Sequence, residues 1–340
     1  MEGGRGACAG EELTWEGGRG SAGGVQVLIS CPYPLDSSHG NVVSARRWEG
    51  VIGEAGFEVR VEEGWGGEGA KVLVALHAVR SAGVVKRFRE RCPTGKVVVV
   101  LTGTDLYGDL LDESSVAHEV LKWADGLVVL NEVALSRMPL GYRQKTRVIG
   151  QSVELPDLGE GEREVVPTFA VVGHLREVKR PFLAVEALQK REGFAARVWQ
   201  VGGEREVGFG ERAREWEAEE GRYCWWGGME REEALRLVVR SWAVVNSSRM
   251  EGGSNALLEA MILGVPVLAS RIDGNVGLLG GDYAGYFEEG DEEELGVLME
   301  RLVEDEIFQM RLRMQMEARV CLFTRALEVE GWREMLEGLI

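Results

Sequence analysis

The chain contains few cysteines, and their positions argue against a metal site or a set of disulfide bonds. Its 340 residues include five cysteines, an odd number, with no C-x-x-C pair among them. Zinc sites and disulfide frameworks need cysteines that are paired or closely spaced. We therefore interpret these residues as free thiols in a reducing compartment, and we expect a cytoplasmic protein.

Long apolar runs and a surplus of basic residues are also missing. No uncharged apolar stretch reaches eighteen residues, so we expect no segment that spans a membrane. The N-terminus has no basic start followed by an apolar run, so we expect no signal peptide. Lysine and arginine number 39 against 56 acidic residues, which gives a net charge of −17. Proteins that bind nucleic acids or anionic membranes need a surplus of lysine and arginine. Because this chain has a surplus of acidic residues, neither is an expected partner.

A divalent-metal motif is missing as well. No D-x-D is placed to hold an ion, since Asp105 and Asp109 are four residues apart. The acidic run 288–294 is interpreted as a solvated helix start, which the helix dipole favours. We therefore expect neither a metal nor another cofactor.

What is present is a long alternation of strands and helices, interrupted once. A chain of this length suits two hydrophobic cores rather than one. Continuous apolar runs separated by helices are typical of parallel sheets buried on both faces. We predict a disordered glycine-rich tail over 1–24, an N-terminal domain over 25–153, an acidic linker over 154–167, a C-terminal domain over 168–310 and terminal helices over 311–340 that cross back to the N-terminal domain.

Both domains are predicted to be doubly wound, Rossmann-like α/β folds that face a common cleft. The N-terminal strands are expected at 25–30, 57–61, 72–77, 96–102, 127–131 and 147–151, with helices at 42–55, 81–91 and 114–124. The C-terminal strands are expected at 169–173, 197–202, 223–226, 243–247, 266–270 and 283–287, with helices at 181–190, 231–240, 254–263, 292–303 and 305–340. Ligands bind at the carboxyl ends of such strands, so the loops that follow them are the candidate sites.

The clearest motif, S-S-R-M-E-G-G-S-N-A-L-L-E-A, follows a strand and opens a helix. Its two glycines let the backbone approach a ligand closely, and the next two residues can cap a helix whose free N–H groups attract anions. Glu251 is thereby placed for a sugar ring and Glu259 for a ribose, with amides for phosphate between them. The residues assigned to the nucleotide-sugar here are Gly252, Gly253, Ser254, Asn255 and Glu259.

An isolated E-x7-E pattern usually marks only a capped helix with a solvated glutamate at each end, because short motifs match by chance. In this chain the G-G-S-N filling, the strand before it and the G-V-P-V-L-A after it favour the functional interpretation.

A second motif, G-H-L-R-E-V-K-R-P, ends a strand and precedes a helix expected to begin at Pro181, because proline is favoured at the first helical position. Arg176 and Lys179 can neutralise a diphosphate, Arg176 as a bidentate donor and Lys179 as a point charge. A solvent-facing basic loop is the alternative, and the motif alone does not decide between the two.

These two motifs resemble the G-R-L-x-x-x-K and E-x7-E motifs of the family 4 retaining glycosyltransferases. The resemblance implies a GT-B fold, a nucleotide-sugar donor and no metal. His174 stands where that family usually has arginine, so Arg176 is expected to take over part of the phosphate contact.

Further stretches are similar to the selenosugar synthases of selenoneine biosynthesis, a branch of that family. They are 39–41 with 45–48, 74–78 with 80–81, 101–107, 173–179, 247–253, 267–272, 277–280 and 282–283. The resemblance implies that a UDP-sugar, UDP-N-acetylglucosamine above all, reacts with selenophosphate to give a 1-seleno sugar, UDP and phosphate. It also implies a functional link to selenophosphate synthase.

The acceptor side agrees with an anionic nucleophile. Relatives often carry a catalytic histidine in a T-H-x-D-like stretch, where this chain has Gly103, which cannot act as a base. Selenophosphate needs no base, because it is already anionic, although His77 remains a candidate. We expect Gly40 and Asn41 at the donor and Arg46, Arg80, Ser81, Thr102, Gly103 and Thr104 at the acceptor. Arg47 is interpreted as part of a polar helix face.

Three other functions stay open on the sequence alone. One is a UDP-sugar-dependent O- or S-glycosyltransferase with another small acceptor. Another is a non-hydrolysing UDP-N-acetylglucosamine epimerase, which shares the fold but fits the two motifs less well. The third is a non-catalytic nucleotide-sugar binding protein.

Overall fold

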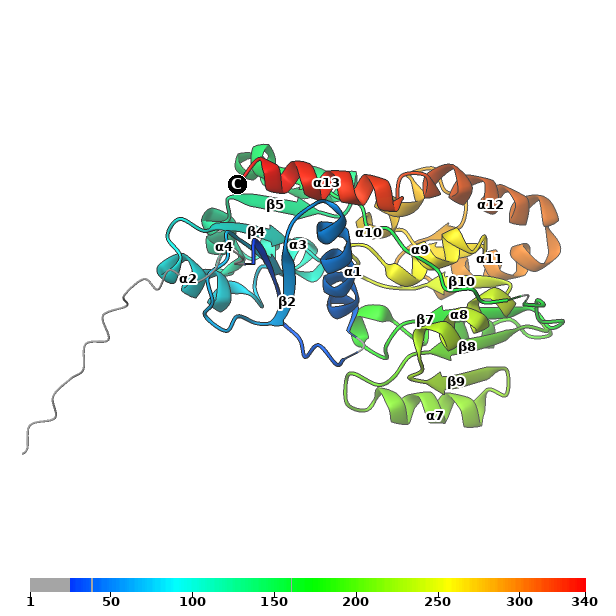
Figure 1. Ribbon diagram of the computed structural model, residues 1–340. Coiled ribbons are helices and arrows are strands. Elements are labelled where there is room, and N and C mark those ends of the chain that lie inside the picture. The colour runs from blue at the N-terminus through cyan, green and yellow to red at the C-terminus, as the bar shows by residue number, and fades with distance from the viewer. Residues whose placement is uncertain (1–24, 38, 160) are drawn as a thin grey trace, which may run out of the picture.

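The computed structural model describes residues 25–37, 39–159 and 161–340, and the prediction for 1–24 lies outside these described residues. The described chain forms two α/β domains side by side, each built on a six-stranded sheet (Figure 1). The expected fold class, two Rossmann-like domains, is therefore confirmed. None of the helices in the described residues is long and apolar enough to cross a bilayer.

The N-terminal sheet has the order β2-β1-β3-β4-β5-β6, and all its pairings are parallel. Its central strands are buried along their whole length, as their continuous apolar sequences predict. The strands are β1 Val27–Cys31, β2 Val59–Glu63, β3 Val72–Leu76, β4 Lys96–Val100, β5 Gly126–Val129 and β6 Thr146–Val148. The helices are α1 Gly40–Glu54, α2 Ala82–Arg91, α3 Thr104–Tyr107, α4 Ala117–Trp123 and α5 Glu132–Arg137, with 3₁₀ turns η1 Asp109–Leu111 and η2 Leu140–Lys145.

The C-terminal sheet has the order β12-β11-β10-β7-β8-β9, again with parallel pairings only. Its strands are β7 Thr168–Val172, β8 Arg197–Val201, β9 Tyr223–Gly227, β10 Ala243–Asn246, β11 Val267–Ser270 and β12 Tyr286–Phe287. The helices are α6 Leu183–Gln189, α7 Phe209–Glu219, α8 Arg231–Arg240, α9 Asn255–Ile262, α10 Asp273–Leu279, α11 Glu292–Glu304, α12 Glu306–Val320 and α13 Arg325–Glu337, with the 3₁₀ turn η3 Glu177–Lys179. Helix α6 thus begins after Pro181 rather than at it.

The last helix belongs to the N-terminal core. Helix α13 runs along the N-terminal domain (Figure 1), where Trp332 packs on Trp48 of α1 with ring centroids 5.4 Å apart. Helix α12 instead packs on the C-terminal domain, against α9, α10 and α11. The boundary expected at residue 310 falls inside α12 and is too early, because the chain crosses back only at the turn 321–324.

In each sheet there is one pair of neighbouring strands from which the chain connections continue toward opposite edges of the sheet. In the N-terminal sheet the pair is β1 and β3, and in the C-terminal sheet it is β7 and β10. Ligands of doubly wound folds bind outside the carboxyl ends of the strands at such switch points.

Candidate active site

The loop between β10 and α9 carries the first carboxylate. The Glu251 side chain is 11% exposed, and it accepts hydrogen bonds from the Lys179 ammonium and from Ser248 Oγ, the latter at 2.6 Å. The backbone that holds Lys179 is itself fixed, because Ser247 Oγ donates to Lys179 O at 3.0 Å. The ion pair therefore joins the two motifs that the sequence analysis treated separately.

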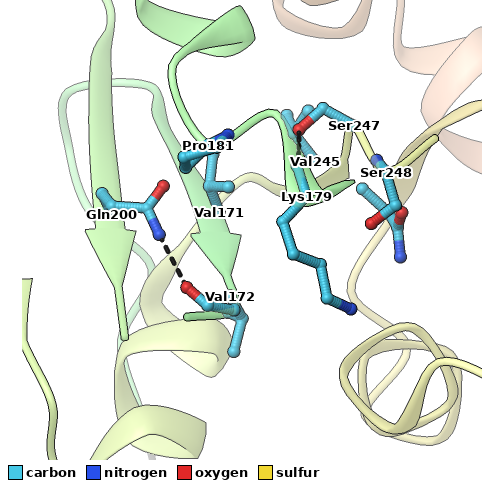
Figure 2. A pocket seen from close by; sticks show the side chains of 10 residues that line it. Val171, Val172, Lys179, Pro181, Gln200, Val245, Ser247 and Ser248 are labelled. Atoms are coloured by element: carbon cyan, nitrogen blue, oxygen red, sulfur yellow. Dashed lines mark hydrogen bonds between the residues drawn. The ribbon is translucent and has the colours of Figure 1, made fainter. Parts of the chain in front are cut away.

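A small pocket opens beside Lys179 at the carboxyl ends of β7, β8 and β10, which is the switch point of this sheet (Figure 2). Gln200, at the end of β8, is buried and donates from Nε2 to Gly173 O at 3.0 Å. Its Oε1 has no hydrogen-bond partner within the described part of the chain. The other lining residues are Val171, Val172, Pro181, Val245, Asn246, Ser247 and Ser248.

The N-terminus of α9 is capped by the residues that the sequence predicts. Ser254 takes extended backbone angles, and its Oγ accepts from the Leu257 N–H at 3.4 Å and from Asn246 Nδ2 at 3.0 Å. Asn255 is the first helical residue, and Gly253 packs beside Leu130 of the N-terminal domain. The amides at this helix end lie directly after the Glu251 loop, where they can meet a phosphate.

Glu259 lies further along α9 with a different cation. Arg231 Nε donates to Glu259 Oε1 at 2.6 Å, and Arg231 also donates to Glu154 O at 2.9 Å. Burial raises the pKa of Glu259, and the nearby charges of Arg231 and Arg47 oppose that rise. The two glutamates of the E-x7-E motif thus have separate partners, as expected if they contact different parts of one ligand.

On the N-terminal side, His77 follows β3 with a positive φ of 68°. This backbone region is uncommon for residues other than glycine, and it recurs at functional sites. His77 is buried, its Nε2 lies 3.0 Å from Thr104 Oγ1, and its Nδ1 accepts from the Arg80 N–H at 3.4 Å. Nδ1 also lies 3.8 Å from Asp105 Oδ2, so both ring nitrogens face polar groups of the loop 102–105 or its neighbours.

The loop 102–104 is shaped by Asp105, a residue that sequence reasoning did not select. Its buried Oδ1 accepts from the N–H groups of Thr102, Gly103 and Leu106 at 2.8 to 3.1 Å. Its Oδ2 accepts from the Ala78 N–H at 2.9 Å, which ties the loop to the end of β3. The available signal in the sequence was the position of Asp105 three residues after Thr102. At this spacing an aspartate carboxylate can accept from backbone N–H groups of the residues just before it.

Gly103 and Gly252 bring the two domains into backbone contact. Gly103 has a φ of +126°, and a Cβ there would lie 2.6 Å from Gly252 N. A Cβ on Gly252 would lie 2.4 Å from Thr102 O. Asn131 Nδ2 also donates to Gly252 O at 3.0 Å. The position where relatives are expected to carry a catalytic histidine is therefore closed off by the loop that holds Glu251.

Cations from both domains gather around the start of α1. His39 caps α1, and its ring stacks on that of Tyr33 with ring centroids 3.5 Å apart. Arg80 Cζ lies over the Tyr33 ring, 5.2 Å from its centroid. Burial, and then Arg176, His174, Arg80 and Arg205 in that order, lower the pKa of His39 to about 4. Neither Tyr33 nor Arg205 was selected from the sequence, because only the fold brings them together.

The expected donor contacts near this cluster lie at its edge. Gly40 is the first residue of α1, and no atom of the described residues lies within 4 Å of the position that a Cβ would take there. The Asn41 N–H donates to His39 Nδ1 at 3.4 Å.

The structure changes the interpretation of two arginines and one serine. Arg46 is exposed and donates to Leu35 O at 2.9 Å, so it fastens a loop of its own domain. Arg47, expected on a polar face, has a side chain that is only 11% exposed, and it reaches Asn255 Oδ1 at 3.2 Å. Its spacing from Ser44, three residues earlier on the buried face of α1, was the signal. Ser81 is buried and donates to Leu76 O at 2.6 Å, so its hydroxyl is occupied.

Across residues 25–37, 39–159 and 161–340, no group of three or more histidine, cysteine, aspartate or glutamate residues is placed to hold a metal ion. The charged groups of the cleft are instead lysine, arginine and the two glutamates described above.

Comparison with solved structures supports the fold over most of the chain. Sucrose-phosphate synthase from Thermosynechococcus elongatus is 14% identical with a TM-score of 0.69, over 92% of this chain and 94% of that one. Alr3699/HepE from Anabaena, solved with UDP and glucose, is 12% identical with a TM-score of 0.69, over 92% and 98%. A TarM mutant from S. aureus, solved with fondaparinux, alpha-GlcNAc-glycerol and UDP, is 15% identical with a TM-score of 0.63. That match covers 78% of this chain, which spans about 55% of the TarM chain.

The family comparison concerns the half of the chain that holds both motifs. Residues 159–320 match the family model described as Glycosyl transferases group 1. This range runs from the linker through α12 and includes Lys179, Glu251 and Glu259. Residues 159–320 are thus similar to the glycosyl transferases of group 1, within a chain of two Rossmann-like domains that shares its fold with these solved structures.

Proposed function

We propose that this chain is a UDP-sugar-dependent glycosyltransferase and that its acceptor is selenophosphate. The observation that carries the transferase part is the Glu251–Lys179 pair, which stands at a switch point beside the N-terminus of α9. Two proteins of the same fold were solved with UDP, which favours UDP as the nucleotide.

In this proposal the donor lies across the carboxyl ends of β7 and β10. Glu251 faces the sugar ring, Glu259 the ribose and the amides of residues 252–255 the diphosphate. Lys179 and Arg176 neutralise the charge that develops on UDP as the glycosidic bond breaks, so no metal is required. Fixed donors of this kind need no rearrangement at the moment of reaction, which is why they stabilise a transition state efficiently.

The acceptor assignment rests on charge and on the missing base. In a protein with a net charge of −17, the cluster around His39 concentrates cations from both domains at the cleft. Gly103 offers no base, and His77 Nε2 is already bonded to Thr104. An acceptor that is already anionic fits both facts.

The proposed reaction balances as follows. Selenium attacks C1 of the sugar while the bond from C1 to the UDP oxygen breaks, and one water then hydrolyses the Se–P bond to release phosphate. The products are a 1-seleno sugar, UDP and phosphate. A selenophosphate synthase in the same compartment, which we take to be the cytoplasm, would supply the acceptor.

The test is an anaerobic assay with UDP-N-acetylglucosamine and freshly made selenophosphate, read by mass spectrometry for the selenium isotope pattern. A seleno-sugar together with UDP supports the whole proposal. UDP release without selenium in the product rejects selenophosphate and keeps the transferase. If neither forms, titration of UDP alone separates a binding protein from a wrong assignment of the site. Lys179→Ala is the matched control and should abolish product formation.

A further inference from the structure

A buried carboxylate on the last helix is connected to the nucleotide-sugar motif through one arginine. Glu328 of α13 is 1% exposed, and its Oε1 accepts from Trp48 Nε1 at 2.8 Å. Its Oε2 accepts from the N–H and the hydroxyl of Ser152, at 2.8 and 2.5 Å. Three segments that are distant in sequence, α1, the start of the linker and α13, therefore meet at this carboxylate.

The same carboxylate holds Arg47. Arg47 Nε lies 3.5 Å from Glu328 Oε1, and the Arg47 side chain is 11% exposed. Burial lowers the pKa of Arg47, and the charge of Glu328 is the largest opposing influence. A buried guanidinium without its partner would be strongly unfavourable, so Glu328 fixes where this cation can lie.

Arg47 in turn reaches the other domain. Its Nη1 donates to Asn255 Oδ1 at 3.2 Å, on the first residue of α9, and its charge also acts on Glu259 one turn later. Its Nη2 donates to Ser44 Oγ at 3.4 Å, which also accepts from Gln151 Nε2 at 2.8 Å. The guanidinium is thus held on both sides and crosses from the N-terminal domain to the donor helix.

We infer that Glu328 is a positioning residue for the nucleotide-sugar site, acting by holding Arg47 against Asn255 at the start of α9. Arg47 is then a further residue of that site, supplied by the opposite domain. Nucleotide affinity depends on the docking of α13 through this connection. The inference rests on the proposed UDP-sugar function where it is tested by the Kd of UDP. Its second test, hydrogen exchange of the α9 amides, does not depend on that function.

The first experiment measures the Kd of UDP by calorimetry in the full chain. Loss of a charged hydrogen bond typically changes affinity roughly ten- to a hundredfold, so Arg47→Met should raise Kd by about that factor, with partial rescue in Arg47→Lys. Glu328→Gln should raise Kd in the same direction. Because Glu328 acts through Arg47, the double variant should bind UDP like Arg47→Met alone. Additive effects, or an unchanged Kd in Arg47→Met, would overturn the inference.

Arg325→Met is the matched control. Arg325 lies on α13 one turn before Glu328 and pairs with Glu54 at 2.7 Å and with Glu154 at 3.2 Å, so it fastens the same helix without contacting Arg47. Its loss should leave the Kd of UDP unchanged. A rise equal to that of Glu328→Gln would mean that helix docking alone matters, and would reject the positioning role.

A second readout does not depend on UDP. Hydrogen exchange of the α9 amides in the first helical turn should accelerate in Arg47→Met and Glu328→Gln, and not in Arg325→Met. If wild type fails to bind UDP, the proposed function fails while this exchange pattern still supports the positioning role. Unchanged exchange in Arg47→Met rejects it. If Glu328→Gln fails to fold, the comparison of Arg47→Met with Arg47→Lys still tests the inference.

Discussion

Glu251 and Glu259 are eight residues apart in sequence but have separate surroundings. Glu251 is bonded to Lys179 and Ser248 at the pocket, whereas Glu259 is paired with Arg231. A group that stabilises the charge developing in the transition state affects turnover. A group that binds the ribose contributes equally to the ground state and the transition state, so it affects affinity.

We therefore expect Glu251→Ala to lower kcat about a hundred- to a thousandfold with little change in the Kd of UDP. Glu259→Ala should instead raise the Kd of UDP roughly tenfold or more. Initial rates and calorimetry on both variants test the assignment. A pair of variants that leaves both quantities unchanged would show that the site lies elsewhere.

His39 gives a prediction about pH. Its pKa is about 4 in the folded chain, below the ordinary value of about 6.5 in an unfolded chain. Between these values the unfolded state binds more protons, so the free energy of unfolding falls as the pH drops from about 6.5 toward 4. Urea unfolding across that range should show a smaller pH dependence in His39→Gln than in wild type. Identical slopes would contradict a lowered pKa for this half-buried histidine.

At the scale of elements, α13 is an integral part of the hydrophobic core of the N-terminal domain. Trp332 is fully buried against Trp48, while Leu327 on the same helix is 54% exposed. Trp332→Ala should lower the free energy of unfolding by about 3–5 kcal/mol, the usual cost of removing a buried tryptophan. Leu327→Ala should change it by less than about 0.5 kcal/mol. Chemical denaturation of both variants, read as the midpoint at constant slope, provides the check.

The strands were predicted more completely from the sequence than the helices were. The twelve strands of the described residues lie near their expected positions, most clearly β1 and β3, whose apolar residues are buried on both faces. Helices α5, α7 and α10 were missed, while α4 and α6, with seven residues each, were expected, so helix length alone does not explain the difference. The single terminal helix expected over 305–340 is two helices, separated at 321–324.

The candidate site shows the same division. Glu251 and Lys179 could be selected because their motifs follow strand ends, but the bond between them joins two loops that the sequence separates by 72 positions. Arg47 was misinterpreted because its partners, Asn255 and Glu328, come from other domains and helices. Contacts of this kind depend on tertiary structure, and the spacing of Arg47 from Ser44 indicates only that Arg47 lies beside the buried face of α1, not which residues it meets.

At the scale of the whole molecule, we predict that the domains close on the donor. The Gly103–Gly252 contact has no room for a side chain, so Gly103→Ala should hold the cleft open. Solution scattering should show a radius of gyration that falls when UDP is added to wild type and does not fall in the variant. Gly56→Ala is the control, since Gly56 has a similar φ of +99° and, among residues 25–37, 39–159 and 161–340, no neighbour within 4 Å of a Cβ. A wild-type radius unaffected by UDP would argue against closure.

The return of α13 to the N-terminal domain also bears on how the protein is made. Domains generally fold in the order in which they leave the ribosome. Here the first sheet to emerge lacks one wall of its core, because Trp332, Met335 and Leu336 are translated after the whole C-terminal domain. The N-terminal domain therefore keeps apolar surface uncovered until α13 has been made, so its core is completed only after the C-terminal domain has been synthesised.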